Sequence, residues 1–136
     1  MKKLLLLAVF GFMLASMGAE RQTFRGPAGR YMGTATEQGN RTTYRDSRGR
    51  ISCTATKSGN SVTYRDNSGR YMGRAVTQGR NTTYYDNRGR VSVRATEQGN
   101  TTSYKSGSGK YMGTARQQGK TTTYRDARGR IKATKR

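Results

Sequence analysis

The fold of this chain is decided by one stretch, Tyr44-Arg45-Asp46-Ser47-Arg48-Gly49-Arg50, which returns along the sequence every 20 residues. Its Tyr-x-Asp-x-x-Gly-Arg pattern recurs at residues 64–70, 84–90 and 124–130, and degraded copies begin at Phe24 and Tyr104. A constant period of this size indicates one small supersecondary unit that packs against copies of itself. We therefore expect about six such units from Thr23 onward.

Each copy predicts two turns joined by two strands. The Asp-x-x-Gly segment at residues 46–49 suits a type I turn in which Gly49 takes a positive φ, and the Gly59-Asn60 pair marks a second turn. The segments between the turns are rich in Thr, Tyr, Ile and Val, which favour strands, and no 3.6-residue apolar period indicates a helix. The sequence predicts an all-β repeat array of antiparallel β-hairpins, built as an open meander sheet or as a β-solenoid.

The alternation of side chains along each strand predicts one dry face and one wet face. Ile51, Cys53 and Ala55 point one way, and Tyr44 of the shorter strand joins them on the expected core face. The opposite face carries Thr and Arg side chains. We therefore expect a sheet with one packed side and one cationic side.

A 40-residue alternation lies within the 20-residue period. Tyr-Met-Gly triplets begin at Tyr31, Tyr71 and Tyr111, whereas the copies between them read Ile51-Ser52-Cys53 and its equivalents. We interpret the triplets as packing devices, in which a large Tyr on the core face covers a neighbouring Gly. A row of aromatic residues that binds a ligand is the alternative.

The N-terminal segment has the layout of a secretory signal peptide. Lys2 and Lys3 precede an apolar run at residues 4–14, and small residues follow up to Ala19. The run is shorter than the ~20 residues that a membrane-spanning helix needs, which disfavours the alternative of an uncleaved anchor. We expect a signal peptide at residues 1–19, a single β-repeat domain at residues 20–136, and export to the periplasm, the cell surface or the medium.

The composition excludes most catalytic and metal chemistry. The chain has no His, so neither a His-based triad nor the usual zinc site is available. The repeated aspartates, of which Asp46 is the first, are expected to bond the backbone of their own turns rather than to bind calcium. Cys53 is the single cysteine, which excludes an intramolecular disulfide. We expect it to be a small apolar strand residue, with an intermolecular disulfide as the alternative, and we expect no enzyme activity and no cofactor.

The repeated turn resembles the YD or RHS repeat of bacterial and animal cell-surface proteins. The segment Tyr85-Asp86-Asn87-Arg88-Gly89-Arg90 matches the Tyr-Asp-x-x-Gly-Arg centre of that repeat, and the 20-residue period agrees with it. The chain departs from the family because Thr43 and its equivalents stand where the family usually has an aromatic residue, and because most copies replace the Tyr of the Tyr-Asp pair by Arg. The resemblance implies a β-hairpin array at a cell surface or in secretion, with carbohydrate binding reported for some members.

The charge is the strongest indication of function. Without Lys2 and Lys3, 25 basic residues face 7 acidic ones, a net charge of +18. Two repeat positions are almost always basic, and parallel rows of such residues favour a polyanionic partner such as lipopolysaccharide, an acidic glycan or nucleic acid, bound in a salt-dependent way. The candidate ligand-binding residues are Arg25, Arg45, Arg65, Lys105 and Arg125 at one position, and Arg30, Arg50, Arg70, Arg90, Lys110 and Arg130 at the other.

Three alternatives to polyanion binding remain open at this point. The charge can serve only as a solvated surface that keeps sheet edges apart. The array can be a structural fibre subunit that self-associates through its end strands. The Thr-x-Thr segments, such as residues 34–36, also resemble ice-binding arrays, although Arg74 and Arg94 interrupt them.

Overall fold

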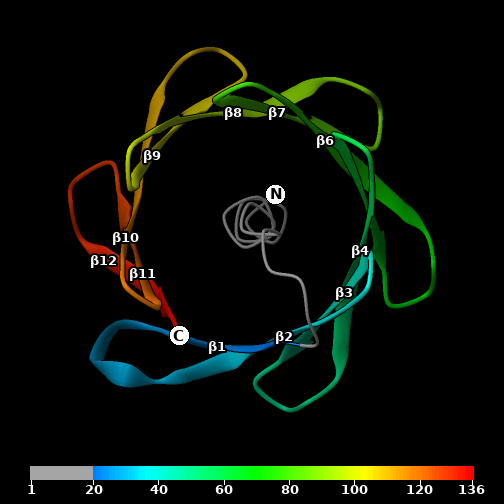
Figure 1. Cartoon of the computed structure of the whole chain (residues 1–136), viewed down its shortest axis with the longest axis horizontal. Helices are drawn as coiled ribbons and strands as arrows, with labels where there is room; N and C mark the ends of the chain where they lie inside the picture. Colours follow the sequence, from blue (N-terminus) through cyan, green and yellow to red (C-terminus); the bar gives the residue numbers. More distant parts are fainter. Residues whose placement is uncertain (1–19) are drawn as a thin grey trace.

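The computed structural model describes residues 20–136, which form a closed antiparallel β-barrel (Figure 1). The predicted signal peptide at residues 1–19 lies outside the described residues. The strands are β1 (Arg21–Arg25), β2 (Tyr31–Gln38), β3 (Arg41–Asp46), β4 (Ile51–Ser58), β5 (Ser61–Asp66), β6 (Tyr71–Gln78), β7 (Asn81–Asp86), β8 (Val91–Gln98), β9 (Thr101–Ser106), β10 (Tyr111–Gln118), β11 (Thr121–Asp126) and β12 (Ile131–Lys135), with a short 3₁₀ turn η1 (Pro27–Gly29) after β1. In the described part of the chain, no helix is long and apolar enough to cross a membrane.

The Asp-x-x-Gly turns form as the sequence predicts. The Gly49 N–H donates to the Asp46 carbonyl at 3.0 Å, the Asp46 N–H donates to the Arg50 carbonyl at 2.9 Å, and Gly49 has φ +79°. This is a type I turn followed by a glycine bulge. The Asp46 Oδ1 also accepts the backbone N–H groups of Arg48 and Arg50 at 2.9 and 3.0 Å, so the turn role expected for the aspartates is confirmed.

The second set of turns closes two-residue hairpins at the other end of the barrel. Gln38 pairs with Arg41 across Gly39 and Asn40, and Gly39 has φ +59°. A glycine with positive φ at the first central position is typical of the type II′ turn, whose twist matches that of the flanking strands. The Asn40 carbonyl then accepts the N–H of Lys57 in the next hairpin at 2.7 Å, which links neighbouring hairpins at this end.

The prediction of an open sheet or a solenoid is wrong, because β1 and β12 pair and close the ring (Figure 1). Phe24 of β1 pairs with Lys135 of β12, in the same register in which Tyr64 pairs with Ala55 in the turn-linked β4–β5 hairpin. Thr23 and Arg136 exchange two backbone hydrogen bonds of 2.7 and 3.0 Å. The two end strands thus replace a sixth turn-linked hairpin, and every strand has two neighbours. Identical units that each add the same twist curve a sheet until its edges meet.

The interior contains the aromatic residue of each repeat and the small residues of the longer strands. Cys53 and Ala55 are completely buried, which confirms the predicted inward direction of these two side chains. Six aromatic residues, one from each repeat, form a circle within the core, and each is at most 6% exposed: Phe24, Tyr44, Tyr64, Tyr84, Tyr104 and Tyr124.

The predicted inward direction of Ile51 and of the triplet tyrosines is wrong. Tyr44 pairs with Cys53 but Arg45 pairs with Ile51, so Ser52 is an extra residue in the ladder. Such a bulge reverses the alternation of the strand and places Ile51 on the outer face, beside Arg45. Val91, at the same position, is partly exposed. The other five side chains at this position are 37–45% exposed: Tyr31, Ile51, Tyr71, Tyr111 and Ile131.

The 40-residue alternation reflects two ways of building this bulge. In the Tyr-Met-Gly units the glycine has a φ that other residues rarely adopt, +146° at Gly73, and a Cβ there would lie 2.2 Å from the Tyr85 carbonyl oxygen. In two of the other units a serine takes part instead, since the Ser52 Oγ donates to the Tyr44 carbonyl at 3.2 Å and the Ser92 Oγ to the Tyr84 carbonyl at 3.1 Å; the third has Lys132 at this place. The glycine therefore serves the backbone, and it does not make room for a tyrosine.

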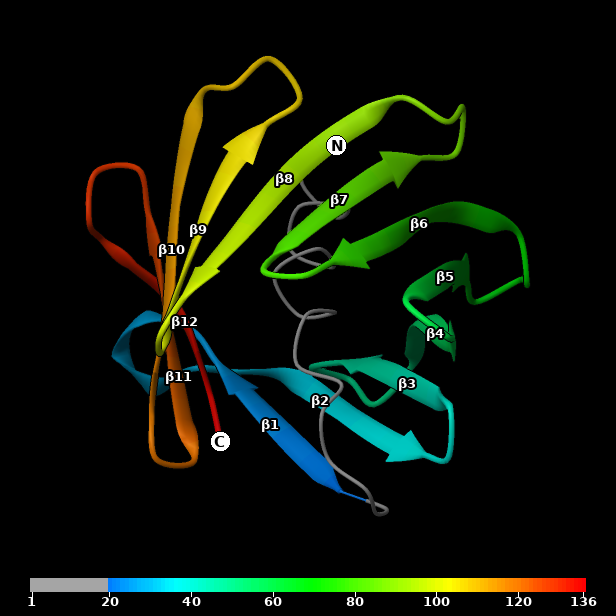
Figure 2. The same cartoon turned by 45° about the horizontal axis from the view of Figure 1, so that its top comes forward.

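The two ends of the barrel differ in shape. The long hairpins lean outward at the Asp-x-x-Gly turns, whereas the type II′ turns form a tighter ring (Figures 1 and 2). The six outward-leaning turns surround one mouth of the barrel, which we call the flared rim and define as residues 25–30, 45–50, 65–70, 85–90, 105–110 and 125–130.

Candidate functional site

Every predicted basic site residue lies on the flared rim, because each one flanks an Asp-x-x-Gly turn or the equivalent turn at residues 26–29 or 106–109. Closure of the sheet turns the two expected rows into two rings. Arg45 follows the buried Tyr44 and pairs with the exposed Ile51, so its ring lies on the outer face. Arg50 precedes Ile51 and bonds Asp46, so its ring faces the mouth of the barrel.

The outer ring braces the turns. The Arg45 Nη1 donates to the Gly49 carbonyl of its own turn at 3.0 Å, and Arg25, Arg65 and Arg125 make the same bond at 2.9–3.1 Å. A guanidinium has five N–H donors, so one bond to a carbonyl leaves most of them for a partner. Sequence reasoning assigned these residues to binding alone and missed their bracing role.

The inner ring combines arginines with the turn aspartates. The Nε atoms of Arg50, Arg90 and Arg130 lie 3.3, 3.0 and 2.9 Å from the aspartate of the same turn, while their side chains stay 62–69% exposed. Backbone N–H donation from Arg90, together with Arg88 and the Arg90 side chain, holds the pKa of Asp86 below its usual value. The exposed pairs add little stability, but they limit the directions in which the guanidinium groups point.

Three further arginines at the tips of the rim were missed as site residues. Alternate turns carry an arginine at their third position, where the remaining turns have Ala28, Ser68 and Ser108. Their signal was the alternation itself, which sequence reasoning attributes to packing. With them the rim holds fourteen basic residues against four aspartates. The tip residues are Arg48, Arg88 and Arg128.

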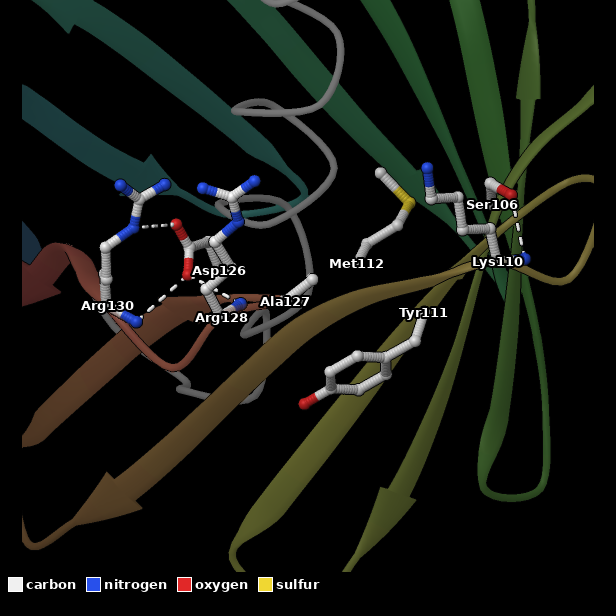
Figure 3. Close-up of a pocket in the computed structure, with 8 residues that line it drawn as sticks. All are labelled: Ser106, Lys110, Tyr111, Met112, Asp126, Ala127, Arg128 and Arg130. Carbon is white, nitrogen blue, oxygen red and sulfur yellow. Dashed lines mark hydrogen bonds and ion pairs between the residues drawn. The ribbon is translucent and has the colours of Figure 1, made fainter.

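A cleft of about 560 Å³ opens between the β9–β10 and β11–β12 hairpins. Figure 3 shows Arg128 and Arg130 side by side around Asp126 on one wall, and Lys110 with Met112 on the other. The Lys110 N–H donates to the Ser106 Oγ at 3.1 Å, so the serine caps a turn that has an aspartate in most other copies. The remaining lining residues are Tyr111 and Ala127.

The described residues show neither a cluster of metal-ligating side chains nor an exposed thiol. Residues 20–136 contain no group of three or more His, Cys, Asp or Glu side chains placed to hold a metal ion. Burial raises the pKa of the Cys53 thiol to about 12, and the side chain has no exposed surface. This environment agrees with a small apolar strand residue and disfavours an intermolecular disulfide.

No protein-family model matches the chain, and no curated protein matches it in sequence. The resemblance to YD repeats therefore rests on the turn motif alone.

Proposed function

We propose that the protein binds polyanions through the flared rim. The observation that carries this proposal is the charge of one end of the barrel, where fourteen Lys and Arg side chains surround four aspartates. A ring of like charges around a concave mouth focuses the electrostatic potential and attracts multivalent anions. Arginine, which supplies twelve of these fourteen residues, also binds phosphate and carboxylate groups through two parallel N–H donors.

The internal bonds of the rim favour binding by lowering its entropic cost. A long side chain that is ordered only on binding costs about 0.5–1.5 kcal/mol. Four outer-ring arginines, Arg25, Arg45, Arg65 and Arg125, are already held by turn carbonyls. Three inner-ring arginines, Arg50, Arg90 and Arg130, are held by aspartates. The rim thus presents a partly ordered array of donors. With the expected export of the chain, its proposed ligands are lipopolysaccharide, acidic glycans or extracellular nucleic acid.

The test compares two triple variants that remove the same charge from opposite ends of the barrel. The rim variant Arg48→Ser/Arg88→Ser/Arg128→Ser introduces the residue that Ser68 and Ser108 already provide in other turns. The control variant Arg41→Ser/Arg80→Asn/Lys120→Asn introduces residues found at the equivalent places of other type II′ hairpins. Both variants should fold, because each change has a precedent within the same array.

Binding is measured as retention on immobilised heparin and as affinity for a heparin oligosaccharide at several salt concentrations. We expect affinity to fall as salt rises, and the rim variant to lower the slope of log K against log salt by about two to three. The control variant should keep an affinity and a salt slope close to those of the wild type. Equal losses in the two variants would show that only total charge matters, and salt-independent binding would remove the electrostatic basis of the proposal.

A further inference from the structure

The cleft between the β9–β10 and β11–β12 hairpins has cationic and apolar side chains on its two facing walls. Lys110 lies on one wall, and Arg128 and Arg130 lie on the other (Figure 3). Met112, which packs against the barrel core, and Ala127 lie between them. A volume of about 560 Å³ is within the usual range for small-molecule sites and suits a group of one or two rings.

The 40-residue alternation repeats these residue types at two further places around the mouth, which are inferred as equivalent clefts from the repeat. Each Tyr-Met-Gly hairpin supplies a methionine and a basic residue, and the hairpin that follows supplies a tip arginine and an inner arginine. In the β1–β2 hairpin the Met32 side chain lies against the first turn residue, because a Cβ at Gly26 would lie 3.2 Å from the Met32 Sδ. The three equivalent sets are Arg30, Met32, Arg48 and Arg50; Arg70, Met72, Arg88 and Arg90; and Lys110, Met112, Arg128 and Arg130.

The three sets differ in how many carboxylates accompany the cations. Every set contains one aspartate on the wall that carries the tip arginine, such as Asp126. The second set also contains Asp66 on the opposite wall, where the first and third sets have Gly26 and Ser106. The first set therefore holds three basic residues and one carboxylate, and the second holds three basic residues and two carboxylates. In the third set the Lys132 Nζ also lies 3.7 Å from the Asp126 Oδ2, so four basic residues accompany one carboxylate.

From this geometry we propose that the first and third clefts are binding sites for a phosphomonoester carried on a sugar ring. Cations on two facing walls suit a phosphate with two negative charges, which both walls can approach. The methionine side chain beside the basic residue packs against the apolar face of the sugar. This inference rests on the proposed function and narrows it to polyanions that carry phosphomonoesters, because the phosphodiesters of nucleic acid bear a single charge.

The three methionines of the described chain give each cleft its own reporter. Met32, Met72 and Met112 carry the only methyl thioether groups of residues 20–136, and ¹³C-methyl NMR of the protein resolves them after assignment with Met→Leu variants. Titration with glucose 1-phosphate should shift the methyl resonances of Met32 and Met112, and the shifts should saturate. Met72 should respond with at least threefold weaker affinity, because Asp66 opposes the ligand.

Two matched variants test the walls of the third cleft. Arg128→Ser should weaken binding reported by Met112 at least fivefold and leave the response of Met32 unchanged. Lys120→Asn removes the same charge from the type II′ end of the barrel, where Asn40 shows that a basic residue is not required, and should change affinity less than twofold.

The ligand controls separate the phosphomonoester from its parts. Glucose, inorganic phosphate and the methyl diester of glucose 1-phosphate should each bind at least tenfold more weakly. Lowering the pH from 7.5 to 5 should weaken the binding of glucose 1-phosphate, because the second pKa of its phosphate is about 6 and the group loses one negative charge. Asp126 stays ionised over this range, since its backbone N–H donors hold its pKa low despite partial desolvation.

The outcomes distinguish this inference from the function on which it rests. Unmoved methyl resonances, or equal affinity for the monoester and its diester, would overturn the phosphomonoester sites while salt-dependent heparin retention persists. Equal responses of Met32, Met72 and Met112 would overturn the charge argument that separates the clefts. Heparin retention that does not depend on salt, or that the rim and control variants lower equally, would overturn the proposed function.

Discussion

Replacement of Gly73 by alanine tests the physical basis of the 40-residue alternation. Gly73 has φ +146° and lies where β6 meets β7, and a Cβ at this position would stand 2.2 Å from the Tyr85 carbonyl oxygen. Real Cβ atoms do not approach an oxygen closer than about 3.0 Å. The backbone must therefore move by roughly an ångström, in a ladder where both strands are already paired.

Two effects set the size of the expected loss. A backbone conformation that is essentially restricted to glycine costs about 1–3 kcal/mol for another residue. Relief of the contact with Tyr85 weakens the adjacent β6–β7 hydrogen bonds, at about 1 kcal/mol for each bond. We expect Gly73→Ala to lower the free energy of unfolding by about 3 kcal/mol, a large part of the 5–15 kcal/mol typical of a domain.

Urea denaturation followed by circular dichroism measures this loss. With a slope of about 2 kcal/mol per molar urea, the midpoint should fall by roughly 1.5 M. Gly69→Asn is the control, because Gly69 has φ +83° and a Cβ there would meet no atom within 4 Å. Asparagine tolerates this region of φ, so the loss in the control should stay below about 1 kcal/mol.

A double variant tests whether the two bulge types are interchangeable. Met72→Ser/Gly73→Val copies Ser92 and Val93, where the serine Oγ donates to the Tyr84 carbonyl at 3.1 Å. It should recover at least half of the stability that Gly73→Ala loses, because it supplies the alternative bulge. A loss for Gly73→Ala no larger than that of Gly69→Asn, or a double variant less stable than Gly73→Ala, would refute the explanation.

Three further predictions concern titration and reactivity. Hydrogen bonds lower the folded-state pKa of the turn aspartates, so the stability that these residues contribute is present above the unfolded pKa of about 3.9 and is lost as pH falls below that value. Acid unfolding monitored by circular dichroism should therefore begin near pH 4, and Asp86→Asn should make the dependence of stability on pH shallower. Burial raises the pKa of Tyr64 and the other core tyrosines, so the stability that they contribute is complete below pH 10 and is lost above it. The phenolate absorbance of these residues at 295 nm should rise together with unfolding. A rise at a pH well below that of unfolding would contradict their burial. Cys53 should react with an aromatic disulfide reagent only as fast as the barrel opens, and rapid labelling of the folded protein would show that its strand is exposed.

The turns and strands were predictable because each is determined by residues close together in the chain. Asp46 and Gly49 define one turn by their own hydrogen-bonding and φ preferences, and Gly59-Asn60 defines the other. The inward direction of Tyr44, Cys53 and Ala55 follows from alternation within undisturbed strand segments. These features need no knowledge of distant parts of the molecule.

Closure and the bulge were not predictable from the same reasoning. A period reveals the unit but not the rotation between units, and that rotation decides whether β1 meets β12. The bulge at Ser52 adds one residue without changing the period, so simple alternation placed Ile51 on the wrong face. The Tyr-Met-Gly triplets were interpreted as packing devices, because the positive φ at Gly33 is visible only in three dimensions.

The candidate site was predicted in its residues but not in its arrangement. The repeated Arg and Lys positions were evident from the sequence, and the structure gathers them on one rim. The bond from the Arg45 Nη1 to the Gly49 carbonyl could not be foreseen, because it depends on the geometry of the glycine bulge. The tip arginines, such as Arg128, gained meaning only when the cleft beside Met112 was seen.

The pairing of β1 with β12 makes the number of repeats a measure of width. In a linear solenoid an extra 20-residue unit lengthens a rod, whereas in this ring it adds two strands to a circumference. A ring of eight such units would be about one third wider than one of six, with one more cleft for every 40 residues added. Duplication or loss of repeats would therefore change the calibre of the mouth and the spacing of its anion sites, while each hairpin kept its own structure.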